Sequence, residues 1–388
     1  MPLLTNTKIT KSLSILPSCA DCGASNCRTN LKPLANKTQA DIVIVADGPS
    51  KALQSLVERT GADLGGYTLI PVSACPGASE EAWKHCQPLI ASEIARLRPK
   101  VVIPFGPRAT QSVVGRYWQN PAELYDRWYG YQIPCQQLNA WICPVGTVAP
   151  QKGQIEISQM WAYRWFRDAI RIKNRPWETV PDINKTVMLL TDPKKIQGFL
   201  KYAATLDLSA FDYETTGLKP EWPNHKIWSM SIAFVREDKL CSVAFPVYWD
   251  NYDAIRAYLT SPGKKVAANM KFEDRWSRMK LRTEVNNWYW DTMQAAHIEN
   301  PARGVAGLKF QAFARLGIPF FASEVDKYFE SEENRKLNNI ASAPLSALLT
   351  YNAIDSAVEL LLASVQMVEN GLIKEHFVPK EFLPCCKN

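Results

Sequence analysis

The sequence predicts two consecutive α/β domains. The chain has 388 residues, more than one ordinary domain needs. In its first half, short apolar runs alternate with amphipathic helical patterns, whereas in its second half three strands come first and helices follow. The two patterns meet at Lys173–Lys185, which contains two prolines, mixed charges and no periodicity. We therefore expect one domain over residues 1–180 and another over residues 181–388.

The first domain is expected to be a small parallel sheet with helices on both faces. Its strands are the short apolar runs Ile42–Ala46, Tyr67–Val72, Val101–Phe105 and Trp141–Val145. The segments between and after them have the spacing of amphipathic helices: Lys51–Arg59, Glu80–Leu97, Pro107–Gly115 and Ile155–Ile172. Strands that alternate with helices in this way form parallel sheets.

The second domain begins with strands at Leu208–Thr215, Ile227–Val235 and Leu240–Val247. Glu237-Asp238-Lys239 lies between the last two as a hairpin turn. The rest of the sequence has mostly helical patterns, and one long helical pattern starts near Pro344 and stops at Gly371. An antiparallel meander followed by helices is typical of a ribonuclease-H-like α/β fold.

Composition excludes a disordered chain, because 13 Trp, 14 Tyr and 14 Phe require burial. We find no signal-peptide pattern and no uninterrupted apolar run long enough for a membrane span, so we expect a cytoplasmic protein without a membrane partner. The net charge is +7. The basic excess lies mainly before residue 183, which fits either contact with nucleic acid or a solvated basic surface.

The most informative segment is Phe211–Leu218. Residues two apart in a strand share a face, so Asp212 and Glu214 point to one side and Phe211 and Tyr213 to the other. Two neighbouring carboxylates repel each other unless a cation lies between them, and Mg²⁺ and Mn²⁺ prefer such oxygen ligands. Taken alone, this pattern also fits a solvated strand face.

Two later segments add to this pattern. Asn269-Met270-Lys271-Phe272-Glu273-Asp274 opens a helical stretch, and Tyr351 and Asp355 share a helix face because they are four residues apart. With these three motifs, residues 185–370 resemble the DEDD superfamily of 3′–5′ exonucleases, and in particular the proofreading domain of family A DNA polymerases. The string Asp291-Thr292-Met293 before a helix also matches that family's spacing.

The resemblance implies hydrolysis of a terminal phosphodiester with two Mg²⁺ or Mn²⁺ ions. Asp212 would bridge both ions, Glu214 and Asp355 would complete the ligands, and Tyr351 would orient the attacking water. The family's second-motif aspartate falls on Glu273, with Asp274 beside it as the alternative. DNA contacts would come from Asn269, Lys271 and Leu218, the last as an apolar wedge or, alternatively, a plain core residue.

Seven of the ten cysteines lie before residue 150, which favours a metal or iron–sulfur site over disulfides. Residues 15–172 resemble the iron–sulfur uracil-DNA glycosylases, and this likeness implies a [4Fe–4S] cluster, or Zn²⁺ in its place, held by Cys19, Cys22, Cys75 and Cys86. That family's catalytic loops are altered here, since Ala46–Ser50 lacks the usual Glu and Pro144–Pro150 lacks a histidine. We therefore expect a glycosylase-like domain without base-excision activity.

Together these resemblances predict a metal-dependent 3′–5′ DNA exonuclease that releases nucleoside 5′-monophosphates. No polymerase motifs fit after Gly371, so we expect it to act alone on single-stranded 3′ ends or to proofread in trans for a separate, phage-type polymerase, in the host cytoplasm. Two alternatives remain open: an active uracil-DNA glycosylase, and a non-catalytic DNA-binding or scaffold module.

Overall fold

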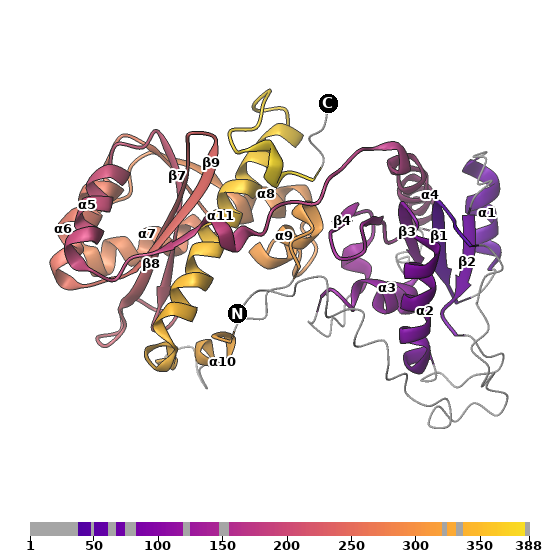
Figure 1. Cartoon of the computed structure of the whole chain (residues 1–388), viewed down its shortest axis with the longest axis horizontal. Helices are drawn as coiled ribbons and strands as arrows, with labels where there is room; N and C mark the ends of the chain where they lie inside the picture. Colours follow the sequence, from indigo (N-terminus) through magenta and orange to yellow (C-terminus); the bar gives the residue numbers. More distant parts are fainter. Residues whose placement is uncertain are drawn as a thin grey trace. The chain divides into compact units, whose positions relative to one another are not determined.

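The computed structural model describes residues 38–47, 50–60, 67–73, 83–118, 125–146, 155–319, 324–330 and 337–384. The chain divides into two compact units. Unit 1 comprises Met1–Thr179 and the segment Phe313–Phe321, and unit 2 comprises Val180–Ala312 and Ala322–Cys386. Figure 1 shows both units with most of their helices and strands labelled.

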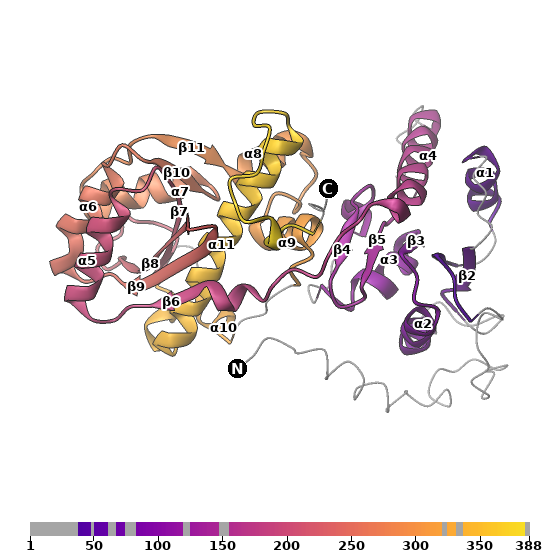
Figure 2. The ribbon, with the colours of Figure 1, turned by 45° about the horizontal axis from the view of Figure 1, so that its top comes forward.

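Unit 1 contains a five-stranded sheet in the order β2-β1-β3-β5-β4. Its strands are β1 (Ile42–Ala46), β2 (Tyr67–Pro71), β3 (Val101–Phe105), β4 (Ile133–Cys135) and β5 (Ala140–Ile142). All neighbours are parallel except β4 and β5. Helix α1 (Lys51–Thr60) packs on α4 (Ile155–Arg171), and α2 (Trp83–Leu97) packs on α3 (Pro107–Val114). The two pairs lie on opposite sides of the sheet (Figure 2), which confirms the predicted fold class.

Two details of this sheet differ from the sequence prediction. The last parallel strand ends at Ile142 rather than Val145, which forms only a single bridge to Phe105. Strand β4 was not predicted, because it has only three residues and one of them is Pro134, a residue that signals the end of a strand.

Unit 2 is built on a six-stranded sheet in the order β11-β10-β7-β8-β9-β6. Its strands are β6 (Val187–Leu189), β7 (Leu208–Thr215), β8 (Ile227–Arg236), β9 (Lys239–Pro246), β10 (Lys264–Ala267) and β11 (Trp288–Asp291). Only β8 runs antiparallel to its neighbours. The β8–β9 hairpin turns at Glu237 and Asp238, whose φ angles of 50° and 56° are typical of a two-residue type I′ turn.

The prediction of mostly helical structure after residue 247 was wrong for β10 and β11. Strand β10 contains only four residues, two of them lysines, so its sequence lacks an apolar strand pattern. Lys265 is nevertheless buried, because its Nζ donates to Ser261 Oγ at 3.0 Å and to Gly263 O at 2.7 Å. Both acceptors lie within four residues of Lys265, in the turn that precedes β10.

Helices cover both faces of the second sheet (Figure 1). One apolar core joins the sheet to α5 (Pro193–Ala203), α6 (Tyr252–Leu259) and α7 (Met270–Trp276). The opposite face carries α11 (Leu345–Glu369), which contacts β6, β7, β8 and β9. By length and composition α11 could cross a membrane, but 89% of its apolar window is buried inside the protein, as in the core helix of a folded domain.

Candidate active site

Three carboxylates from β7 and α11 converge at the surface of the second sheet. One oxygen each from Asp212, Glu214 and Asp355 lies within 4.8 Å of the other two. Glu214 and Asp355 are buried, and Asp212 is half-buried. Phe211, on the opposite face of β7, belongs to the core with α5, α6 and α7. The alternation of β7 therefore directs its two carboxylates toward α11.

Small side chains on β8 let α11 approach these carboxylates closely. Ser231 and Ser229 lie directly opposite Asp212 and Glu214 in the antiparallel ladder. Both serine hydroxyls donate to Asn352 of α11, Ser231 to its backbone oxygen at 2.7 Å and Ser229 to its Oδ1 at 3.1 Å. A larger residue at either position would push the helix away from the sheet.

Asn352 orients Asp212. Its Nδ2 donates to Asp212 Oδ2 at 2.6 Å, while its Oδ1 accepts from Ser229. Because Ser229 donates its hydrogen bond to the amide oxygen of Asn352, the NH₂ group of Asn352 faces the Asp212 carboxylate. Sequence reasoning missed Asn352, although its position immediately after Tyr351 places it on the same helix turn as the third motif.

Tyr351 lies one helical turn before Asp355 and hydrogen-bonds to its side chain. Burial, then the charges of Asp355 and Glu214, raise the pKa of Tyr351, so its hydroxyl stays protonated and can donate. Lys309 of α9 (Leu308–Leu316) adds a positive charge here. Its Nζ lies 4.9 Å from the centre of the Tyr351 ring and 3.2 Å from Asp326 Oδ1. No sequence motif identified Lys309 as a residue of this site.

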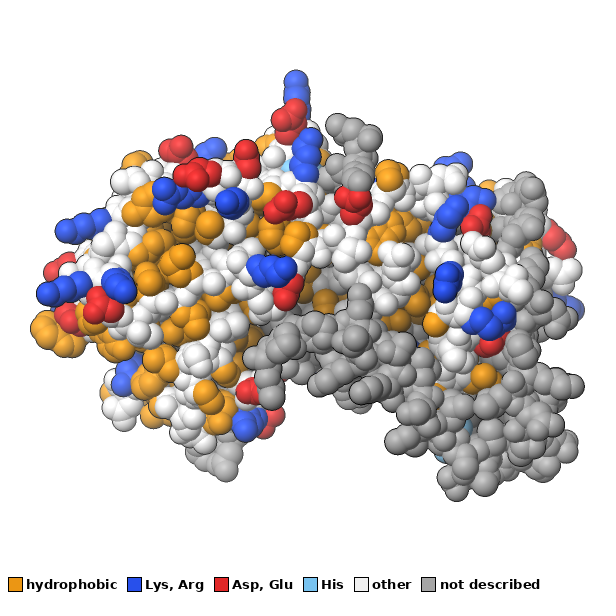
Figure 3. Space-filling view, in the orientation of Figure 1, with side chains coloured by type: hydrophobic (Ala, Val, Ile, Leu, Met, Phe, Trp, Pro, Cys, Tyr) orange, Lys and Arg blue, Asp and Glu red, His pale blue; other side chains and the backbone are white. Residues whose placement is uncertain are grey.

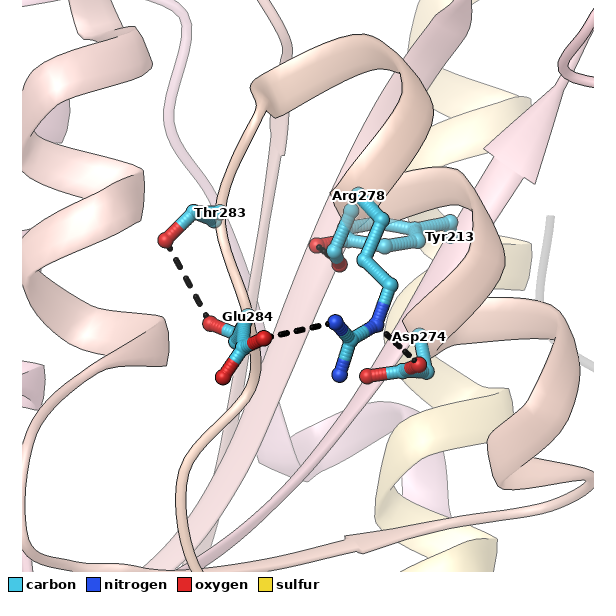
Figure 4. Close-up of polar contacts among 6 residues, drawn as sticks. Tyr213, Asp274, Arg278, Thr283 and Glu284 are labelled. Carbon is cyan, nitrogen blue, oxygen red and sulfur yellow. Dashed lines mark hydrogen bonds and ion pairs between the residues drawn. The ribbon is translucent and has the colours of Figure 1, made fainter.

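Glu273 and Asp274 have different surroundings. Glu273 is buried at 2% exposure, and within the described part of the chain its Oε2 has no hydrogen-bond partner. Burial, and then the nearby charge of Asp212, raise its pKa well above the ordinary value. Asp274 instead accepts from Arg278 Nε at 2.7 Å, and Arg278 also binds Glu284 (Figure 4). Glu273 therefore belongs to the carboxylate cluster, and Asp274 belongs to a solvent-facing ion pair.

A further buried carboxylate adjoins the cluster. Glu359 is 1% exposed and accepts a hydrogen bond from the backbone N–H of Ala268 at 3.1 Å. Its pKa is raised by burial and by the charges of Asp212, Glu273 and Asp355. Sequence reasoning missed this residue, although it follows Asp355 by four residues, the same spacing that links Tyr351 to Asp355.

The site is electrostatically unfavourable without a cation. Burial raises the pKa of Asp355 to about 7, although Lys309 and Tyr351 oppose the shift. Burial and the neighbouring carboxylates also raise the pKa values of Asp212 and Glu214. Among the described residues, buried Asp355 Oδ1 and Glu273 Oε2 lack any hydrogen-bond partner. Such acceptors fit hard divalent cations such as Mg²⁺ or Mn²⁺.

The three residues predicted to contact DNA lie on or next to β7 and α7, two elements that also carry residues of the carboxylate cluster. Leu218 follows the end of β7 and is 56% exposed, so it is not a core residue. Its loop turns at Gly217, where a Cβ would come within 2.5 Å of the buried His225 ring. Asn269 is half-buried at the start of α7, and Lys271 is exposed. Their contacts with DNA stay a prediction.

Three of the four predicted cluster cysteines, Cys19, Cys22 and Cys75, lie outside the described residues. The fourth, Cys86, is half-buried on α2. The iron–sulfur cluster therefore stays a prediction.

No protein-family model and no curated protein matches the sequence. Among solved structures, the chain is similar to NrnC of Brucella melitensis, with a TM-score of 0.34 and 16% identity over 49% of this chain and 85% of that one. The catalytic core of RRP6 from Trypanosoma brucei gives a TM-score of 0.35 and 14% identity over 51% of each chain. Escherichia coli RNase D, an exoribonuclease involved in structured RNA processing, gives 0.34 and 12% over 48% and 45%. The aligned part thus spans about half of the RRP6 and RNase D chains.

Proposed function

We propose that unit 2 is a metal-dependent 3′–5′ exonuclease. The observation that carries this proposal is the buried set of oxygen ligands from Asp212, Glu214 and Asp355, with their oxygens within 4.8 Å of one another. Glu273 and Tyr351 lie beside this set and complete the residue types of the three sequence motifs. A structural role alone does not account for so many buried carboxylates, because their mutual repulsion destabilises the folded chain.

Each residue has a distinct part in this proposal. Asp212, Glu214 and Asp355 would hold two divalent cations, which when bound activate water and neutralise charge on the scissile phosphate. The protonated Tyr351 hydroxyl would orient the attacking water beside Asp355. Glu273 would reach the cations through water. Asn352 would fix the orientation of Asp212.

The substrate proposed is DNA with a single-stranded 3′ end, cleaved to nucleoside 5′-monophosphates. Leu218 would wedge against the terminal bases, since its exposed side chain follows β7 directly. Asn269 and Lys271 would contact the strand from the start of α7. On the face drawn in Figure 3, blue and red side chains are interspersed over unit 2, without a continuous basic patch. Proofreading in trans for a separate polymerase is the cellular role we propose.

For unit 1 we propose a glycosylase-like DNA-binding module whose cysteines hold a [4Fe–4S] cluster, with Zn²⁺ as the alternative. Base excision is the second candidate activity. The mostly parallel sheet of unit 1 is the observation that favours base excision. The altered catalytic loops argue against base excision.

The deciding experiment follows degradation of 5′-labelled single strands by the full chain. DNA, RNA and uracil-containing DNA are each incubated with Mg²⁺, Mn²⁺ or EDTA, and products are resolved on gels. We expect progressive shortening of DNA from its 3′ end only when a metal is present. The Asp355→Asn variant should not shorten DNA under any of these conditions. Metal-independent cleavage, or no cleavage of any strand with either metal, would refute the exonuclease proposal. Faster degradation of RNA would reassign the substrate, and alkali-labile sites at uracil would restore the glycosylase alternative.

A further inference from the structure

Three consecutive backbone N–H groups, from the residue after β10 to the first residue of α7, donate to carboxylates that are distant in sequence. Ala268 N–H donates to Glu359 Oε1 at 3.1 Å. Asn269 N–H donates to Asp291 Oδ1 at 3.0 Å, and Met270 N–H donates to Asp291 Oδ2 at 2.9 Å. This turn leads directly into α7, the helix that carries Glu273. Two remote acidic side chains therefore hold the segment that determines where α7 starts.

The turn needs this support because no side chain of its own caps α7. Asn269 adopts a left-handed backbone conformation, with φ 68° and ψ 58°, which is uncommon for a residue other than glycine. Its side chain makes no capping hydrogen bond to α7. The first N–H groups of a helix have no partner within the helix, so an outside acceptor is required. For Met270, the first residue of α7, that acceptor is Asp291.

Asp291 is fixed independently of the turn. It ends β11, where it pairs with Ala267 of β10, and it is the N-cap of α8 (Thr292–Glu299). Its Oδ1 also accepts from the N–H groups of Met293 and Gln294, each at 3.0 Å. One buried carboxylate thus binds the N-termini of two helices and ties both to the edge of the sheet. Its oxygens are engaged with backbone N–H groups, so Asp291 is not a metal ligand in this arrangement.

The start of α7 decides which side chain enters the carboxylate cluster. Successive residues of a helix are rotated by about 100°, so a shift of one residue would bring Asp274 or Phe272 to the position of Glu273. In the folded protein Glu273 is buried beside Asp212, and Asp274 binds Arg278 in solvent. We propose that Asp291 and Glu359 are positioning residues, which hold the Ala268–Met270 turn so that Glu273 faces the metal-binding carboxylates. This inference rests on the proposed exonuclease function.

The Asp291→Asn substitution tests whether Asp291 positions Glu273. The amide oxygen can replace Oδ1 and keep its partners Asn269, Met293 and Gln294, whereas the new NH₂ group would face the N–H of Met270. We expect the single-turnover rate to fall by about tenfold or more, because small displacements of catalytic groups are costly, while KM changes by less than about threefold. In a Glu273→Ala background, Asp291→Asn should cause no further loss, since both changes act through one side chain.

Two further measurements separate positioning from general destabilisation. Asp192→Asn is the matched control: Asp192 caps α5 in the same way, accepting from Lys195 N at 2.9 Å, and this change should leave the nuclease rate unaltered. Hydrogen exchange of the segment that spans Ala268–Met270 should accelerate in Asp291→Asn but not in Asp192→Asn. Glu359→Gln keeps an acceptor for Ala268, so it should retain at least about fivefold more activity than Glu359→Ala.

The outcomes distinguish this inference from the proposed function. If the wild-type chain degrades no strand, the exonuclease proposal fails, and hydrogen exchange alone then decides whether Asp291 holds the turn. Unchanged exchange of the turn in Asp291→Asn would overturn the inference in either case. A loss of rate in Asp291→Asn that multiplies with the loss from Glu273→Ala would also overturn it, because the two residues would then act independently.

Discussion

Asn352 Nδ2 lies 2.6 Å from Asp212 Oδ2, so the long helix α11 fixes the orientation of the central carboxylate on strand β7. The bond joins residues 140 positions apart in the sequence. Ser229 holds the other end of the same amide group. The carboxylate that faces both other acids of the cluster is therefore oriented before any cation arrives, and this reduces the reorganisation needed on metal binding.

Replacing Asn352 by Asp should impair the site strongly. The change removes the donor to Asp212 and adds a carboxylate to a cluster that is already repulsive. We expect the nuclease rate to fall by on the order of tenfold to a hundredfold and the Mn²⁺ dissociation constant to change in titrations. Ser229→Ala is the control: it leaves Asn352 Nδ2 in place and should cost less than about fivefold. A fully active Asn352→Asp variant would show that the orientation of Asp212 is unimportant.

Asp212→Asn and Asp355→Asn should each reduce the nuclease rate to below about a tenth of wild type, a rise in barrier of more than about 1.4 kcal/mol. Both changes remove metal ligands while keeping side-chain shape. The metal-free variants should unfold at the same temperature as wild type or higher, because one repulsive charge is lost. Asp253→Asn, whose carboxylate is 94% exposed on α6, is the control and should leave the rate unaltered. Either site variant retaining more than a tenth of the rate would rule out the two-metal assignment.

Glu273→Ala should slow hydrolysis at least about tenfold more than Asp274→Ala, a difference of about 1.4 kcal/mol in barrier. The buried Glu273 carboxylate adjoins Asp212, whereas Asp274 pairs with Arg278 on the exposed side of α7. Steady-state rates of both variants on the same single-stranded DNA test the difference. The reverse order would mean that Asp274, not Glu273, serves the site.

The metal-free protein should become less stable as pH rises toward 8. Burial raises the pKa of Asp355 to about 7 in the folded state, well above its value of about 4 in an unfolded chain. Between these values the folded state binds more protons than the unfolded state, so the free energy of unfolding falls as pH increases. The raised pKa values of Asp212 and Glu214 act in the same direction.

Thermal unfolding in EDTA at about pH 5 and about pH 8 measures this dependence. Saturating Mg²⁺ should stabilise the protein most at the higher pH, because bound cations favour the charged carboxylates. Asp355→Asn should make the metal-free dependence shallower. A melting temperature that rises with pH in EDTA would contradict the predicted sign.

Metal analysis of the purified chain tests the prediction for unit 1. Protein made with intact iron–sulfur assembly should be brown, with absorbance that is lost on oxidation, if Cys19, Cys22, Cys75 and Cys86 bind a [4Fe–4S] cluster. Loss of the cluster should destabilise residues 1–172 and leave nuclease activity mostly intact, since the carboxylates belong to unit 2. Finding zinc without iron would mean that the four cysteines bind Zn²⁺ and not an iron–sulfur cluster. Finding neither metal in anaerobically prepared protein would mean that they are ordinary cysteines.

The sequence by itself determined the features that depend on local periodicity. The alternation of β7 places Asp212 and Glu214 on one face, and the helical spacing of α11 pairs Tyr351 with Asp355. The position of the turn between β8 and β9 and the limits of α11 at Pro344 and Gly371 were likewise predictable, because they depend on neighbouring residues alone, although Lys239 belongs to β9 and not to the turn. Local geometry of this kind is the same in any folded context.

Only the tertiary structure decided which other groups join the cluster. Strands β10 and β11 have only four residues each, too few to show a clear strand alternation, so the sequence pattern hid them. Glu273 faces the site rather than Asp274 because Asp291, on another strand, sets the start of α7. Asn352 and Glu359 lie on a helix whose alignment against the sheet no sequence period specifies. Hydrogen bonds between distant segments form only when the sheet and helices pack, and for that reason they are absent from any local pattern.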